Sequence, residues 1–148
     1  MIEVKKAQMD SLDAKELIQE LNQVLTEITG DDGTANFKAS DVQKEKSTFF
    51  IVYVDEKPYG CGALRKISDD VAEIKRVYAR KNKLGIGSIV VQSLENAAAS
   101  FGYKKILMET RVQNQNAIHF YEKNGYTHCE NFGKYVGKEN AYCFMKCL

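Results

Sequence analysis

The sequence predicts an α/β (α+β) fold: a mixed central sheet of about six to seven strands with an antiparallel N-terminal meander, a βαβ crossover and a C-terminal hairpin. The meander is predicted by three strand-like runs between residues 48 and 79 that only short turns separate. The crossover is predicted because a periodic helix of about four turns then leads to a further strand-like run. With 148 residues, 44% of them hydrophobic, the chain is expected to form one domain spanning residues 1–148.

The N-terminal segment is predicted to form a strand followed by a helix. Residues 1–7 alternate apolar and polar side chains, which is typical of a strand with one buried face. Asp10 or Ser11 can cap the helix, whose apolar residues recur at spacings of one, three and four between residues 17 and 28. The helix is expected to end near Gly30, before a loop and a further short helix or turn.

The three central runs are predicted to form the meander. Residues 48–54 are almost all β-branched, aromatic or otherwise apolar, as expected for a strand that is covered on both faces. Residues 59–67 form the second strand, in which Gly60 and Gly62 indicate either a bulge or close packing against a neighbour. Residues 71–79 form the third strand.

The crossover helix is predicted over residues 86–101, and Gly102 can end it in a left-handed conformation. A strand over residues 105–110 follows. In a βαβ unit this strand and the strand at 71–79 should be parallel neighbours joined by a right-handed crossover.

The C-terminal part is predicted to contain a short helix over residues 115–124, with Gly125 as its stop signal. Residues 126–130 and 141–147 are then expected to pair as a hairpin. This hairpin is apolar enough to pair across a possible homodimer.

The connection between the third strand and the crossover helix, residues 80–88, has features of an anion site. A helix start presents unpaired backbone N–H groups and the positive end of the helix dipole. Gly85 and Gly87 would let a ligand approach closely, although they would equally suit a tight strand-to-helix turn. A dinucleotide motif is excluded because Val90 stands where its third glycine belongs, and no Gly-Lys-Ser/Thr of a P-loop is present.

The charge composition excludes some classes of partner. The formal net charge of +1, from 21 basic and 20 acidic residues, argues against nonspecific nucleic-acid binding. The cations gather locally instead, which suits a phosphorylated small ligand: Lys75, Arg76, Arg80, Lys81 and Lys83.

The four cysteines show no metal-ligand spacing, and no secretory signal is recognised before them. We therefore expect no metal site, reduced thiols and a cytoplasmic location. No apolar run approaches the roughly 20 residues of a membrane span, so no membrane partner is expected.

Two motifs carry a resemblance to a known family. Residues 82–87 (Asn-Lys-Leu-Gly-Ile-Gly) are similar to the acyl-CoA signature Gln/Arg-x-x-Gly-x-Gly/Ala of a strand-to-helix turn. Residues 114–126 match Asn-x-x-Ala-Ile-x-x-Tyr followed by Gly-Tyr. With both motifs in place, the chain resembles a small single-domain bacterial-type member of the GNAT superfamily, the Gcn5-related N-acetyltransferases. It departs from the family pattern at Asn82, which replaces Gln or Arg.

The resemblance implies an acetyltransferase of the GNAT fold with acetyl-CoA as cosubstrate and no metal. The acetyl group would pass directly to a primary amine in a ternary complex; the alternative is a catalytically silent CoA-binding regulatory or protein-interaction module. The pantetheine would pair with the strand edge at 77–79, and the N–H of Val77 would polarise the thioester. The pyrophosphate would lie on the turn, with Lys81 or Lys83 supplying charge. The cofactor-binding residues so implied are Val77, Tyr78, Ala79, Asn82, Lys83, Leu84, Gly85, Ile86, Gly87, Ser88 and Asn114.

The resemblance also implies two catalytic residues. Tyr121 would donate a proton to the departing thiolate, since a phenol with a pKa of about 10 is protonated at neutral pH; the alternative is a plain core aromatic. Glu73 would be the general base, as in some relatives that include histone acetyltransferases, or else a carboxylate paired with Lys75 or Arg111. Glu109 is a second choice for the base.

The acceptor pocket is expected to draw on the first helix, the loop after it and the strand from Tyr59. In that loop Asp31 and Asp32 would either attract a cationic amine or form a solvated turn. The sequence does not identify the amine acceptor.

Overall fold

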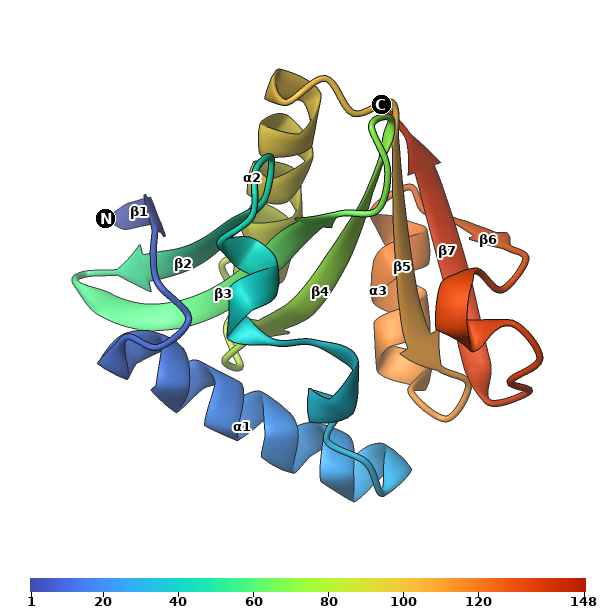
Figure 1. Ribbon diagram of the computed structural model, residues 1–148. Helices are drawn as coiled ribbons and strands as arrows, with labels where there is room; N and C mark the ends of the chain where they lie inside the picture. The colour runs from blue at the N-terminus through green and yellow to red at the C-terminus, as the bar shows by residue number, and fades with distance from the viewer.

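A seven-stranded sheet forms the centre of the structure, a computed structural model that describes all 148 residues (Figure 1). Its strands are β1 (Ile2–Lys6), β2 (Thr48–Val54), β3 (Lys57–Lys66), β4 (Val71–Ala79), β5 (Lys105–Arg111), β6 (Thr127–Cys129) and β7 (Ala141–Cys147). They lie in the order β1-β2-β3-β4-β5-β7-β6, and only β4 and β5 are parallel. The predicted mixed sheet, with its meander, crossover and C-terminal hairpin, is confirmed.

Three α-helices cover the two faces of the sheet (Figure 1). They are α1 (Leu12–Thr29), α2 (Ile86–Ser100) and α3 (Gln115–Lys123), and the 3₁₀ helices are η1 (Thr34–Asn36), η2 (Ala39–Val42) and η3 (Gly133–Tyr135). Helix α1 lies on one face, and α2 and α3 pack on the other. None of these helices combines the length and the apolar character that crossing a bilayer requires.

Each face of the sheet has its own apolar core. Sixteen buried residues pack between the sheet and helices α2 and α3, and seven pack on the α1 side. Strand β2 contributes to both, because Phe49 and Ile51 point toward α1 while Val52 points toward α2. The expectation that this strand is covered on both faces is therefore correct.

The glycines of β3 let helix α2 approach the sheet. A Cβ atom on Gly60 would lie 2.8 Å from Ile86 Cγ2, and one on Gly62 would lie 2.6 Å from Val90 Cγ1. The register of β3 against β4 also shifts between Cys61 and Ala63. The two alternatives predicted for these glycines, a bulge and close packing, thus both occur here.

Strands β4 and β5 are paired only where they begin. Residues 71–73 of β4 pair with residues 105–107 of β5, and no pairing follows. Beyond that point β5 continues to pair with β7 as far as Arg111, and the two parallel strands separate (Figure 1). The edge of β4 that faces β5 is therefore without a strand partner beyond Glu73.

The local signals at the helix ends act as expected in α1. The Ser11 hydroxyl accepts a hydrogen bond from the Ala14 N–H at 3.3 Å, and Gly30 ends the helix with φ of 80°. The segment between the two strands of the predicted C-terminal hairpin contains a 3₁₀ helix, η3, and buries Tyr135. No apolar periodicity precedes this short helix, so the pattern gives no signal for it.

Candidate active site

A cavity of about 680 Å³ lies where β4 and β5 separate. The C-terminal half of α1, strands β4 and β5, and α3 surround it. The two helices contribute much of its apolar lining, including Leu21, Val24, Leu25, Ile28, Ala117 and Phe120, and β4 and β5 contribute the rest. Because α1 and α3 lie on opposite faces of the sheet, the cavity passes through the gap between the two strands.

The structure brings part of the predicted cofactor site to this cavity. The predicted residues that line it are Val77, Tyr78, Ala79, Gly87 and Asn114. The remaining predicted residues form the turn beyond β4 and do not line the cavity: Asn82, Lys83, Leu84, Gly85, Ile86 and Ser88. The side chain of Ile86 is fully buried in the core, so only its backbone belongs to the turn.

The Asn82 side chain organises the turn from within. Its Oδ1 accepts hydrogen bonds from the Leu84 N–H at 2.8 Å and the Ile86 N–H at 3.2 Å. The N–H groups of Gly85, Gly87 and Ser88 have no acceptor in the chain. Three of the five backbone N–H groups from Leu84 to Ser88 are thus available to a ligand.

The two glycines of the turn are needed for different structural reasons. Gly85 precedes α2 with φ of 72°, a left-handed conformation that favours glycine, and the space around it is open. A Cβ atom on Gly87 would lie 3.1 Å from the ring of Phe120, so this glycine lets α2 pack against α3.

The predicted cations do not form one cluster: some pair with residues of the fold, and others line the cavity. Arg80 donates to Glu20 at 2.9 and 2.6 Å and forms an ion pair with Glu16 at 2.9 Å, so both carboxylate partners of this guanidinium lie on α1. The hydrogen bond from Arg80 is the main cause that lowers the pKa of Glu20. Lys81 lines the cavity and Lys83 does not.

Asn114 and Tyr121 bring α3 to the cavity. Asn114 Oδ1 caps α3 by accepting from the Ala117 N–H at 3.2 Å, while the residue also lines the cavity. Tyr121 is 6% exposed and its hydroxyl makes no hydrogen bond within the chain. Its ring packs edge-on against Tyr126 at 5.6 Å. Burial raises the pKa of the Tyr121 phenol, which keeps it protonated.

Glu73 is not among the residues that line the cavity with Tyr121. It is 1% exposed and forms an ion pair with Arg65 at 2.7 Å, whereas Lys75 Nζ lies 3.7 Å from its second oxygen. This second oxygen has no hydrogen-bond partner. Of the two predicted partners, Lys75 forms an ion pair with Glu73 and Arg111 does not, while the shorter ion pair, with Arg65, was not predicted. Glu73 lines a separate cavity of about 400 Å³.

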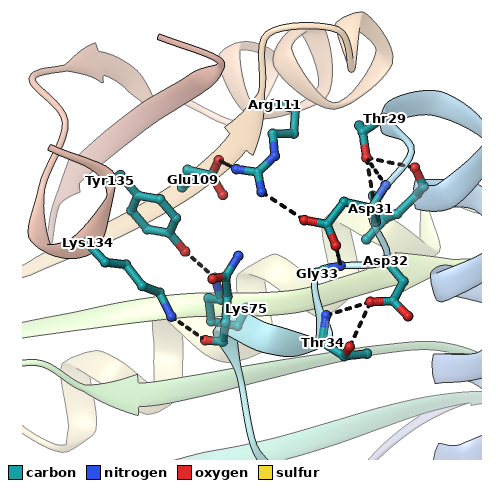
Figure 2. A network of polar contacts seen from close by, with 12 residues as sticks. Thr29, Asp31, Asp32, Gly33, Thr34, Lys75, Glu109, Arg111, Lys134 and Tyr135 are labelled. Carbon is teal, nitrogen blue, oxygen red and sulfur yellow. Dashed lines mark hydrogen bonds and ion pairs between the residues drawn. The ribbon is translucent and has the colours of Figure 1, made fainter. Parts of the chain in front are cut away.

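A polar network borders the cavity on the α1 side (Figure 2). Lys75 donates to the Tyr135 hydroxyl at 2.6 Å, and Arg111 bridges Glu109 at 2.8 Å and Asp31 at 3.3 Å. Burial lowers the pKa of Lys75 and raises that of Glu109, although opposite charges nearby oppose both changes. Sequence reasoning missed Tyr135, for which the only signal was an aromatic residue in a glycine-containing segment that also carries Phe132.

The two acidic residues of the loop after α1 have structural partners. Asp31 accepts from the Gly33 N–H at 3.0 Å, which is the main cause that lowers its pKa, and Arg111 adds to this effect. Asp32 accepts from the N–H and hydroxyl of Thr34 at 2.9 and 2.7 Å. These contacts favour the turn over a dedicated cation site. Nowhere in the chain do three His, Cys, Asp or Glu residues group so that they could hold a metal ion.

The chain is similar to bacterial acetyltransferases. It is 26% identical over 147 residues to the uncharacterized N-acetyltransferase YsnE of Bacillus subtilis, covering 95% of this chain and 97% of YsnE. It is 33% identical over 88 residues to the uncharacterized N-acetyltransferase YjcF of the same organism, covering 58% of this chain and 60% of YjcF. The crystal structure of a GNAT family acetyltransferase from Elizabethkingia anophelis, solved with acetyl-CoA bound, has the same fold. It superposes with a TM-score of 0.72 at 15% identity, covering 99% of this chain and 98% of that one.

A sequence model of the acetyltransferase (GNAT) family matches residues 14–126, from the first turns of α1 to the end of the second motif. This match includes the separated parallel strands, the glycine turn and the tyrosine of α3. The chain therefore belongs to the acetyltransferase (GNAT) family.

Proposed function

We propose that the protein transfers an acetyl group from acetyl-CoA to a primary amine within one ternary complex. The observation that carries this proposal is the cavity through the gap between β4 and β5, with free N–H groups of the turn beyond one end of β4 and Tyr121 on its wall. A cavity open to both faces of the sheet would let two substrates meet from opposite sides. The acetyl-CoA bound to the Elizabethkingia anophelis acetyltransferase supports the choice of donor.

The residues present fit an elongated, phosphorylated cosubstrate. The unpaired edge of β4 at residues 77–79 offers backbone groups that can pair with the amides of the pantetheine. The N–H groups of Gly85, Gly87 and Ser88 at the start of α2 suit phosphate oxygens, and Lys81 adds a positive charge. When bound, acetyl-CoA supplies an activated acetyl group and a thiolate leaving group.

Three roles then fall to the chain. The amine nitrogen must lose a proton as its bond to the carbonyl carbon forms, and the sulfur must gain one as the carbon–sulfur bond breaks. The N–H of Val77 is proposed to polarise the thioester oxygen, as an oxyanion-hole donor does. Tyr121 is proposed to give its hydroxyl proton to the thiolate, since burial keeps the phenol protonated and its hydroxyl has no other partner.

Two carboxylates are candidate acceptors of the amine proton, Glu109 and Glu73. Glu109 lines the cavity and is positioned by Arg111, so it can touch an acceptor directly. Glu73, the base expected from the resemblance, lies behind Lys75 and reaches the cavity only through that side chain. We therefore propose Glu109 as the group in contact with the amine and Glu73 as the residue that holds Lys75.

The test combines binding with turnover. Calorimetry should show acetyl-CoA binding at submillimolar concentration, and a thiol-release assay should show turnover on at least one member of a panel of primary amines. Binding without turnover on any amine would favour the alternative, a catalytically silent CoA-binding module. Absence of acetyl-CoA binding would overturn both functions.

A further inference from the structure

A buried arginine on the cavity has no carboxylate partner. Arg76 lines the cavity and is 9% exposed. Its guanidinium donates to the backbone oxygen of Asp32 at 2.9 Å and to the side-chain oxygen of Asn22, and both acceptors are neutral. No carboxylate lies within ion-pair distance of it. Burial lowers the pKa of Arg76, because its charge is removed from water and the negative charge of Asp32 offsets this effect only in part.

The carboxylates around Arg76 are already held by other groups. Arg111 forms ion pairs with both Glu109 and Asp31, and Asp32 accepts hydrogen bonds from Thr34. Arg65, on the far side of Lys75, binds Glu73 and Asp41. Among the charged residues that line the cavity, the cations Lys75, Arg76, Lys81 and Arg111 outnumber the carboxylates Asp31 and Glu109, so the cavity is poorly suited to a polycationic amine.

The backbone is distorted at Arg76 in a way that adds this charge to the α1 face. Arg76 has φ of 57°, a left-handed conformation that costs a non-glycine residue roughly 1 kcal/mol. Ile74 and Val77 both pack toward α2, so the two residues between them share the opposite face. Lys75 and Arg76 thus lie side by side at the cavity, where a regular strand would have sent one of them into the apolar core.

The wall that α1 contributes beside this charge is apolar. Val24 and Ile28 of α1 are 38% and 37% exposed, and both line the cavity together with Leu25. Apolar side chains that face a cavity gain stability when an apolar ligand group covers them. The cavity thus combines an apolar surface with a buried, unpaired guanidinium.

We propose that the acceptor is an amine that also carries a carboxylate and an apolar side chain, with Arg76 and Lys75 as the counter-ions of the carboxylate. Free α-amino acids with apolar side chains have this chemistry. The inference rests on the proposed function for the transfer itself. It goes beyond that function because it specifies that the acceptor carries a carboxylate beside its amine.

The test uses matched sets of acceptors. Leucine, methionine and phenylalanine are each compared with their amides and decarboxylated amines, and spermidine represents the polyamines. Turnover is followed by thiol release, and binding of each compound to the protein with CoA is followed by calorimetry. The wild type should turn over at least one of the three acids with a kcat/KM about tenfold or more above its decarboxylated amine.

Three variants separate recognition from folding. Arg76→Gln should remove the preference by raising KM for the acid, with little change in kcat/KM for the decarboxylated amine or in acetyl-CoA affinity. Arg76→Lys should keep part of the preference. Lys134→Gln is the matched control, since it removes a charge from an exposed residue that does not line this cavity. Melting temperatures report whether each variant folds, and the wild-type comparison stands without them.

Several results would overturn the inference. They are equal or better use of the decarboxylated amines or spermidine, equal loss for acid and amine in Arg76→Gln, and no binding by any of the three acids. If an acid binds through Arg76 but no amine is turned over, the carboxylate site stands and the proposed function fails. If amines are turned over without preference for the acids, the proposed function stands and the carboxylate site fails.

Discussion

The side-chain oxygen of Asn82 lies 3.2 Å from the backbone nitrogen of Ile86, the first residue of α2. The same oxygen accepts from the Leu84 N–H, while Asn82 Nδ2 donates to the Arg80 carbonyl at 2.7 Å. Asn82 therefore closes the turn and satisfies one of the free donors at the helix start. In this chain the residue that departs from the family signature holds the backbone, and we propose that phosphate contact is left to the remaining N–H groups and Lys81.

Substitutions at Asn82 should separate stability from cofactor binding. Asn82→Ala loses the cap and should lower the free energy of unfolding by about 1 kcal/mol. Asn82→Asp keeps the acceptor oxygen but loses the donor to the Arg80 carbonyl, so only part of the stability should be retained, and its negative charge should weaken acetyl-CoA binding roughly tenfold. Thermal melts and calorimetry measure the two effects. Full acetyl-CoA affinity in Asn82→Asp would place the phosphates away from this turn.

Tyr121→Phe should reduce turnover and leave binding intact. The hydroxyl makes no hydrogen bond within the chain, so its removal should hardly change stability or acetyl-CoA affinity. If it supplies the proton for the thiolate, kcat should fall about 100-fold. The measurement is steady-state thiol release beside calorimetry, and an effect on KM alone would contradict the role.

Tyr126→Phe is the matched control for this prediction. The Tyr126 hydroxyl donates to Glu95 Oε2 at 2.9 Å in the core, and Tyr126 does not line the cavity. Its removal should lower the free energy of unfolding by about 1 to 2 kcal/mol, because Glu95 loses a buried donor, while kcat is retained. The two tyrosines should thus show opposite effects.

The pH dependence of kcat/KM should distinguish Glu109 from Glu73. A general base must be ionised, so activity is lost as the pH falls through its pKa. Burial raises the pKa of Glu109 above its ordinary value of 4.5, so this loss should occur at a higher pH than for an ordinary carboxylate. In Glu109→Gln the acid limb should disappear and kcat should fall, whereas Glu73→Gln should keep the limb. The reverse pattern would restore Glu73 as the base.

The fold was predictable because its signals are local. Alternating strands, Ser11 at the start of α1 and the glycine turn before α2 each follow from short patterns. The site depends on contacts between residues far apart in the sequence. The direction of Glu73 depends on its ion pair with Arg65. The access of Tyr121 to the cavity depends on the separation of β4 from β5. The left-handed Arg76 shifts the alternation of β4 by one residue, and no pattern in the sequence predicts that shift.

The ion pair between Glu20 and Arg80 should make stability depend on pH. Hydrogen bonding to Arg80 lowers the pKa of Glu20 below its ordinary value of 4.5. A carboxylate with a lowered pKa stabilises the folded state above its unfolded pKa, and this contribution is lost as the pH falls through the folded pKa.

Because the Glu20 side chain is 35% exposed, solvent screening limits the contribution to about 1 kcal/mol. Glu20→Gln should therefore melt below the wild type at pH 7, and the difference should shrink as the pH falls below 4.5 and vanish below the lowered pKa of the folded state. Glu27→Gln, on the same helix but exposed and without an ion pair, should melt like the wild type at every pH. A constant difference across this range would mean that Glu20 acts through neutral contacts, and Arg80 would then hold α1 to the end of β4 without the charge of its partner.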